Sequence, residues 1–324
     1  MDIKRITNDH IVATAHYAEL QVETLLDSRD VEVKLECEVV GPEQGEKLDE
    51  FRQSEARRAH ATQALRTTML RMIDERLPFD EPRHEYGHQH DGRLRKNWRW
   101  AYYNGQATYN FNGDQYQTFD PRGRPLVPQV CVDFLTDTFE RASGTWFLDK
   151  TLIDAGQPAK RRVGRLDLSE FNRDQLRRAP GFVKFAEEHP EWFEVKHTTP
   201  TQRANIRLSR RDRLFAFLEQ NLTDYQPGDI VMIRGKTPWD PAKMHYHSFF
   251  IYEKDPISGI PIALAGNAGT PSIRAWGIEI RRTPKRSIWH RIRPNLTWLE
   301  HIIEPDSKTT LQPLSLAGMD ATAD

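Results

Sequence analysis

The residue best suited to covalent chemistry in this chain is Cys131, within the stretch Val127–Leu135. A loop that contains Pro128 leads into an apolar helical pattern, which places the cysteine in the first turn of a helix. Unpaired N–H groups at a helix N-terminus carry partial positive charge, which stabilises a thiolate and can hold an oxyanion. We therefore predict that Cys131 is a nucleophile with a lowered thiol pKa; the alternative is a buried apolar cysteine.

A histidine that can serve as the base follows much later in the chain. His247 opens the apolar stretch Ser248–Tyr252 and follows a Pro227-Gly228-Asp229 turn. An imidazole beside a thiol holds it as an ion pair and then protonates the leaving amine, which is the chemistry of a cysteine hydrolase. His245 is the alternative base, because residues two apart in a strand point to the same side.

The order of these motifs resembles that of the NlpC-type and CHAP-type cysteine peptidases of the bacterial cell wall. The resemblance covers roughly residues 128–295 and implies a papain-like, NlpC-type core, in which the helix of the nucleophile packs on an antiparallel sheet. Two departures are the Ser248-Phe249 pair after the histidine and the long interval before it. The segments that carry the resemblance are Cys131-Val132-Asp133, Pro227-Gly228-Asp229-Ile230-Val231, His247 to Ile251 and Gly266-Asn267-Ala268-Gly269.

The resemblance also implies further roles and a substrate class. A third polar residue that orients the imidazole is expected at Asn267, for which a turn residue in the Gly266–Gly269 segment is the alternative. Gln129 is a candidate oxyanion donor, although it lies much closer to its cysteine than the corresponding glutamine of papain does. The expected reaction is hydrolysis of an amide bond, in peptidoglycan stem peptides, without a cofactor. Such a protein would act in the periplasm or outside the cell.

A second kind of chemistry is indicated by His84-Glu85-Tyr86-Gly87-His88, which matches the HExxH pattern of zinc peptidases. That pattern needs a helix that brings both histidines to one face. Pro82 and Gly87 disfavour a helix, so a polar loop is the favoured interpretation. A looser zinc site at His84, His88 and His90 is the metal-binding alternative. A non-catalytic wall- or peptide-binding module on the same fold is a third hypothesis.

The hydrophobic pattern predicts an α+β fold in which short strands follow helices. An aromatic β-hairpin is expected from Trp98 to Phe111, around Asn104-Gly105, and is the candidate binding surface of the third hypothesis. Cys37 is expected on the apolar side of a strand, as a core residue. We expect helices over 8–28, 47–77, 130–142 and 214–222, a turn over 41–45, and strands over 30–40, 229–234, 247–253, 260–265, 276–281 and 287–293.

Four regions follow from these patterns. Residues 1–80 form an N-terminal helical region with one strand, and 81–127 contain a polar, histidine-rich loop and the aromatic hairpin. Residues 128–305 form the cysteine hydrolase domain, with an insertion over 145–226. Residues 306–324 are expected to be a disordered tail.

Composition excludes several other classes of protein. The formal net charge is −1, so no overall positive field favours nucleic acid. Two cysteines do not make a framework of several disulfides, and no stretch is long and apolar enough for a transmembrane helix. The residues that follow Met1 do not form a signal peptide, which leaves the cellular address open.

Overall fold

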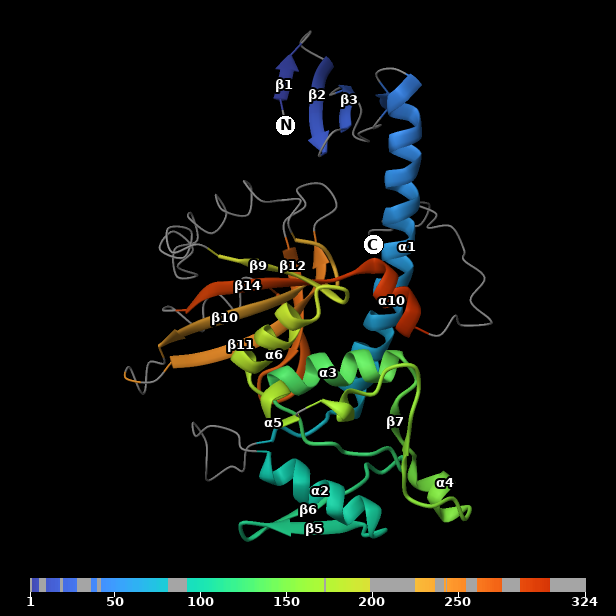
Figure 1. Ribbon diagram of the computed structural model, residues 1–324, viewed down its shortest axis with the longest axis vertical. Helices are drawn as coiled ribbons and strands as arrows, with labels where there is room; N and C mark the ends of the chain where they lie inside the picture. Colours follow the sequence, from blue (N-terminus) through green and yellow to red (C-terminus); the bar gives the residue numbers. More distant parts are fainter. Residues whose placement is uncertain are drawn as a thin grey trace, which may run out of the picture.

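The protein is an α+β structure, as the hydrophobic pattern predicts (Figure 1). All strand pairs in the described part of the chain are antiparallel. The computed structural model describes residues 2–5, 10–17, 20–27, 36–39, 42–80, 92–171, 173–198, 225–236, 242, 244–254, 261–275 and 286–303. The helix expected over 214–222, the strand expected over 276–281 and the tail over 306–324 lie outside these residues.

The N-terminal region is a four-stranded sheet, so the prediction of a helix over 8–28 is wrong. Its strands are β1 (Asp2–Arg5), β2 (His10–Tyr17), β3 (Leu20–Asp27) and β4 (Glu36–Val39), in that order. The segment 10–27 alternates well enough to pair as a hairpin, with Tyr17 opposite Leu20. The β-branched residues of β2 favour this extended form. Cys37 lies in β4, as predicted, opposite Thr24.

A 34-residue helix, α1 (Pro42–Glu75), links this sheet to the rest of the protein. It confirms the helix predicted over 47–77, but it begins within the stretch expected to be a turn. Its C-terminal half buries Leu65, Met69 and Met72 completely. The helix ends before Arg76, whose positive φ of 53° breaks the helical geometry ahead of Pro78.

The aromatic hairpin was predicted at the wrong Asn-Gly pair. Residues 93–103 form α2 (Arg93–Tyr103), and Asn104-Gly105 closes its C-terminus, with Gly105 at φ 65°. The hairpin is instead β5 (Thr108–Phe111) with β6 (Asp114–Gln117), turning at Asn112-Gly113, where both residues have positive φ. The signal that the sequence contained was helical spacing: Leu94, Trp98, Ala101 and Tyr102 are the apolar residues that α2 buries.

The central feature is a six-stranded antiparallel sheet in the order β13-β12-β11-β10-β14-β9. Most of its strands match the predicted ones within a few residues, but β13 precedes the predicted 276–281 strand. The strands are β9 (Phe193–His197), β10 (Ile230–Lys236), β11 (Met244–Lys254), β12 (Pro261–Asn267), β13 (Pro271–Ala275) and β14 (Arg286–Pro294). The sheet is followed by α10 (Leu296–Ile302).

Within the stretch 145–226, which was expected as an insertion, the described residues belong to the same fold. Its strand β9 pairs with β14 and becomes an edge of the central sheet. Its helix α6 covers that side of the sheet (Figure 1). The other elements in this stretch are β7 (Trp146–Phe147), α4 (Lys150–Asp154), β8 (Arg161–Arg162), the 3₁₀ turn η2 (Leu168–Glu170), α5 (Arg173–Leu176) and α6 (Ala179–Glu188).

The helix predicted over 130–142 is α3 (Cys131–Ala142), which packs across β11 and β12. Phe134 and Phe139 meet Phe250 of β11, with ring centroids 6.4 and 5.5 Å apart. All three rings are almost fully buried. From Met244 to Phe250, where the register of β11 is regular, even-numbered residues therefore point toward α3, whereas odd-numbered residues point to the opposite face of the sheet.

Replacing Phe250 with alanine should lower the free energy of unfolding by about 3–5 kcal/mol, because the cavity opens between α3 and the sheet. Met244 lies on the same strand and is 47% exposed. Met244→Ala is therefore the matched control and should change stability by less than about 1 kcal/mol. Urea denaturation measures both variants, and equal losses would mean that α3 does not depend on this contact.

Candidate active site

Cys131 is the first residue of α3, as predicted from the sequence. Val130 precedes the helix in an extended conformation, and its backbone N–H donates to Asp133 Oδ2 at 2.8 Å. The carboxylate of Asp133, in the first turn, thus caps the N-terminus of the helix. Part of the Cys131 residue is exposed, but its thiol is buried where the residue packs against the main core.

The thiol of Cys131 lies beside Ser248 of β11. Burial raises the pKa of the thiol, and hydrogen bonds with the side chain and backbone of Ser248 only partly oppose that effect. The nearby charge of Asp133 also raises the pKa. The hydroxyl of Ser248 is fully buried and lies beside this thiol. The sequence predicted a thiolate at this helix N-terminus. The surroundings of Cys131 instead favour the protonated thiol, which is neutral near pH 7.

His247 does not face Cys131 in this structure. Ser248 and Phe250 point toward α3. Because side chains alternate along a strand, His247 and Phe249 point to the opposite side of β11. Their rings lie 5.9 Å apart. The alternative base, His245, shares the face of His247. On its own side His247 is buried and lines a small hollow, together with Phe249, Leu264, Gly266, Ala268, Ser272 and Arg274.

Asn267 and Gln129 do meet, on the α3 side of the sheet. Asn267 Nδ2 donates to Gln129 Oε1 at 3.4 Å, and Asn267 Oδ1 accepts from the backbone N–H of Gly269 at 3.2 Å. These bonds fit the turn alternative for Asn267. The amide nitrogen of Gln129 donates to Asp137 Oδ2 at 2.6 Å. Gln129 is thereby directed to a carboxylate, which is a positioning role and not that of an oxyanion donor.

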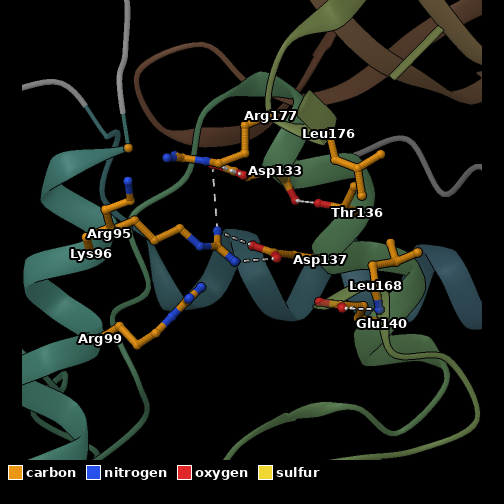
Figure 2. Close-up of a pocket in the computed structure, with 11 residues that line it drawn as sticks. Arg95, Lys96, Arg99, Asp133, Thr136, Asp137, Glu140, Leu168, Leu176 and Arg177 are labelled. Carbon is orange, nitrogen blue, oxygen red and sulfur yellow. Dashed lines mark hydrogen bonds and ion pairs between the residues drawn. The ribbon is translucent and has the colours of Figure 1, made fainter. Parts of the chain in front are cut away.

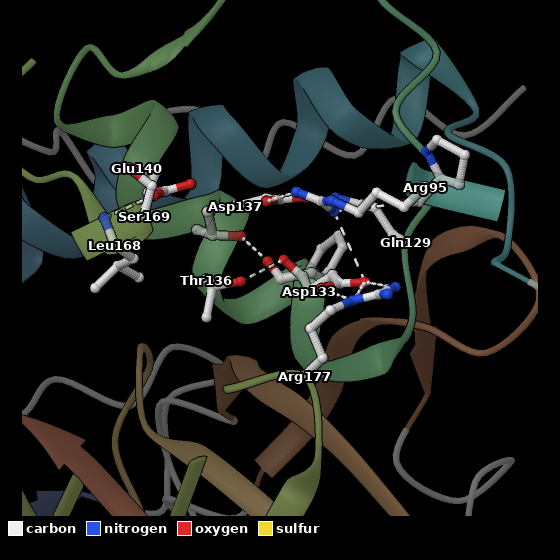
Figure 3. A network of polar contacts seen from close by, with 12 residues as sticks. Arg95, Gln129, Asp133, Thr136, Asp137, Glu140, Leu168, Ser169 and Arg177 are labelled. Atoms are coloured by element: carbon white, nitrogen blue, oxygen red, sulfur yellow. Dashed lines mark hydrogen bonds and ion pairs between the residues drawn. The ribbon is translucent and has the colours of Figure 1, made fainter. Parts of the chain in front are cut away.

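A buried network of charged residues contacts α3 on the side that faces away from the central sheet (Figure 3). Arg95 of α2 binds both oxygens of Asp137, at 2.7 and 2.9 Å. Arg177, which follows α5, binds Asp133 at 2.7 Å and also pairs with Asp80. Although burial alone would raise the pKa of Asp133, Arg177 and Arg95 lower it below its ordinary value. The carboxylate of Asp133 therefore stays ionised in the interior.

Asp229 shapes the Pro227-Gly228 turn. It is fully buried, accepts the backbone N–H of Gln226 at 2.9 Å, and forms a two-point ion pair with Arg293 at 2.7 and 2.8 Å. The zinc alternative, His84, Glu85, His88 and His90, lies outside the described residues. Within the described ranges, histidine, cysteine and carboxylate side chains do not gather into a set of three that could hold a metal ion.

Sequence reasoning missed Ser248, Asp137 and Arg95 as parts of this site. Ser248 stands within an apolar run that is buried on both faces, so the pattern did not indicate which residues point toward α3. Asp137 lies one helical turn after Asp133, and that spacing was a usable signal of a shared face. Arg95 was missed because it precedes the expected hairpin, in a stretch that was expected to be a polar loop, whereas the structure places it in α2.

A scan against protein-family models, a search of curated proteins and a search of solved structures found no match to this chain.

The rate of alkylation of Cys131 by iodoacetamide should keep rising as the pH passes about 8.5, the ordinary thiol value. The reason is that the raised pKa leaves little thiolate at neutral pH. Peptide mapping by mass spectrometry locates the modified cysteine, and the chain unfolded in urea is the reference. Ser248→Ala removes a hydrogen bond that lowers the pKa, so it should slow the reaction further at a given pH. Fast alkylation at pH 6 would contradict this assignment.

Replacing Arg95 with methionine should lower the free energy of unfolding by about 3–5 kcal/mol, because Asp137 is left charged and uncompensated in the interior. Combining Arg95→Met with Asp137→Leu should cost less than the sum of the single changes. Lys150 pairs with Asp154 on the surface, so Lys150→Met is the control, with an expected loss of about 0–1 kcal/mol. Additive losses in the double variant would show that the Arg95–Asp137 pair is not coupled.

Proposed function

We propose that residues 128–305 form a papain-like cysteine hydrolase domain that cleaves an amide bond, with peptidoglycan stem peptides as the substrate class. The observation that carries the proposal is the position of Cys131: a partly exposed cysteine at the N-terminus of a helix packed on an antiparallel sheet. The order of the Cys131, Pro227-Gly228-Asp229 and His247 motifs supports the same class. The substrate class rests on that resemblance.

The reaction requires the thiol to lose its proton. The sulfur then attacks the carbonyl carbon of the amide, the C–N bond breaks and the amine leaves with a proton. Water hydrolyses the resulting thioester and regenerates the thiol. The N–H groups in the first turn of α3 that lack an intrahelical partner would stabilise the oxyanion that forms on the way.

This mechanism needs a group that accepts the proton of the Cys131 thiol, and the described residues do not place such a group beside the thiol. Ser248, which contacts the thiol, is a poor base, and the adjacent His247 faces the other way. His290, a buried histidine on the α3 side of the sheet, lies on β14, two strands away from Ser248. His247 is thus the candidate base by its adjacency to Ser248 in the chain, and catalysis requires a rearrangement at the start of β11 that presents its imidazole to the thiol.

The contact between Cys131 and Ser248 also favours a second candidate function, a non-catalytic wall- or peptide-binding module on the same fold. A neutral thiol that is hydrogen-bonded to a hydroxyl is stable and unreactive. In such a module Cys131 would be a packing residue, and its loss would leave binding intact.

Release of new amino groups from peptidoglycan fragments should be lost in Cys131→Ala, because the variant lacks the nucleophile. His247→Ala should lower kcat by a factor of about 100 or more, as expected for loss of a general base. His245→Ala, on the same face of the same strand, is the matched control and should retain most of the activity. Mass spectrometry of the fragments and an amine-reactive dye measure the products.

Two results would decide against the hydrolase. One is release of amines that persists in Cys131→Ala. The other is a wild-type protein that cosediments with peptidoglycan but releases no amines, with the same binding in Cys131→Ala. The second result would establish the non-catalytic module.

A further inference from the structure

We propose that Arg234, which lies over the ring of Trp289, binds a free carboxylate of the peptide whose amide bond is held at Cys131. Arg234 thereby determines the specificity of the proposed hydrolase, and the inference rests on that proposed function. The motifs around Cys131 and His247 do not contain this requirement: the substrate must carry a carboxylate within a residue or two of the reacting amide.

Arg234 lies on the same face of the central sheet as the thiol of Cys131. Met232 of β10 is opposite Ser248 of β11, whose hydroxyl lies beside that thiol. Arg234 is opposite Tyr246, one step further along the same ladder. Directly opposite residues of an antiparallel pair share a face, and so do residues two apart along a strand. One step is roughly 7 Å, and two residues of an extended peptide span about the same length.

A β-bulge directs the ring of Trp289 to this face. The register between β10 and β14 shifts by one residue between Met232 and Ile233, which leaves Trp289 as the extra residue. Such a residue re-aims its side chain, and bulges are frequent next to active sites. The ring of Trp289 lies 5.4 Å from that of Tyr246. Both rings are partly buried against the core cluster on which Cys131 also packs, so the three side chains share one surface.

The guanidinium of Arg234 differs from those on the other side of α3 in having no acidic partner. Arg95 and Arg177 are each bound to a carboxylate of α3 there (Figure 2). Arg234 is half-buried, and among the described residues no carboxylate or carbonyl oxygen bonds to it. Its guanidinium carbon lies 5.0 Å from the centre of the Trp289 ring. That contact fixes the guanidinium and consumes none of its N–H donors, which remain available to a ligand.

The charges of the neighbouring strands favour an anion at this position. The stretches 230–236, 244–250 and 286–292 of β10, β11 and β14 contain neither aspartate nor glutamate. Lys236, two residues after Arg234 on the same face, is exposed and adds long-range attraction. A guanidinium presents a planar fork of donors that matches the two oxygens of a carboxylate. The carboxylate is also the anionic group that a peptide substrate itself carries.

The test is isothermal titration calorimetry of the full chain with Cys131→Ala, which binds a substrate without cleaving it. The probe is the stem pentapeptide L-alanyl-γ-D-glutamyl-L-lysyl-D-alanyl-D-alanine, which has two free carboxylates. The control ligand has both converted to amides, and two peptides with one amide each identify the carboxylate that is recognised. Its amidation should weaken binding about tenfold or more, and binding of the free acid should weaken as salt is raised.

Variants of Arg234 in the same Cys131→Ala background test the residue itself. Arg234→Gln should weaken binding of the free acid about tenfold or more and leave that of the amidated peptide unchanged. Arg234→Lys keeps the charge but loses the fork, so its affinity should lie between the two. Lys150→Gln removes a surface charge from α4, outside the central sheet, and should bind as the parent does. Circular dichroism checks that each variant is folded.

Kinetics with Cys131 restored separate binding from a merely structural role. Arg234→Gln should raise KM for the release of amines about tenfold and leave kcat within about twofold, because the contact with the carboxylate is made equally in the ground state and the transition state. A residue that acted only by supporting the position of Cys131 would lower kcat as well.

The role of Arg234 and the hydrolase can fail separately. Absence of saturable binding of the free acid, equal affinity for the amidated peptide, or unchanged affinity in Arg234→Gln would overturn the role of Arg234, whatever the activity of the wild type. A wild type that releases no amines, together with binding that still depends on the carboxylate and on Arg234, would remove the hydrolase and leave the carboxylate site in place.

Discussion

The burial of α3 on all sides is the constraint on which the rest of this structure depends. Residues 132–140 of the helix are all buried, although three of them are acidic. Asp133, Asp137 and Glu140 follow one another at helical spacing and form a single row of carboxylates. An unpaired carboxylate in the interior costs several kcal/mol, so each needs a cation. The three cations come from different elements: Arg177 after α5, Arg95 in α2 and Arg161 in β8.

This row of ion pairs joins parts of the chain that are far apart in sequence. Because the three arginines belong to separate segments, α2, β8 and the segment after α5 must all pack on one side of α3 while the sheet packs on the other. Gln129 extends the network, since it connects Asp137 to Asn267 at the end of β12. The turn that leads into α3 is therefore fixed by Asp137 on one side and by Asn267 on the other. This arrangement positions Cys131 against Ser248 and leaves the thiol little freedom to move.

The sequence predicts best the elements whose pattern has a single interpretation. The helix of Cys131, the C-terminal half of α1 and four of the strands of the central sheet follow from spacing and from turn residues. The prediction failed where a signal had two physical meanings. Asn104-Gly105 ends a helix and Asn112-Gly113 forms a hairpin, yet both pairs tolerate positive φ and look alike in sequence. The segment 10–27 satisfies both a helical and an alternating pattern, and strand pairing decided between them.

The orientation of His247 shows why the candidate site was the harder part to predict. In β11 both Phe249 and Phe250 are buried, since the strand is central and both faces are covered. Such a strand has no polar face, so its sequence does not reveal which residues point toward α3. A shift of one residue exchanges the two faces and would bring His247 to the position that Ser248 holds. Under the proposed mechanism, a single step in the register of this strand separates the described orientation of His247 from one that faces Cys131. Local motifs alone do not fix that step, whereas the packing of Phe250 on Phe134 and Phe139 does.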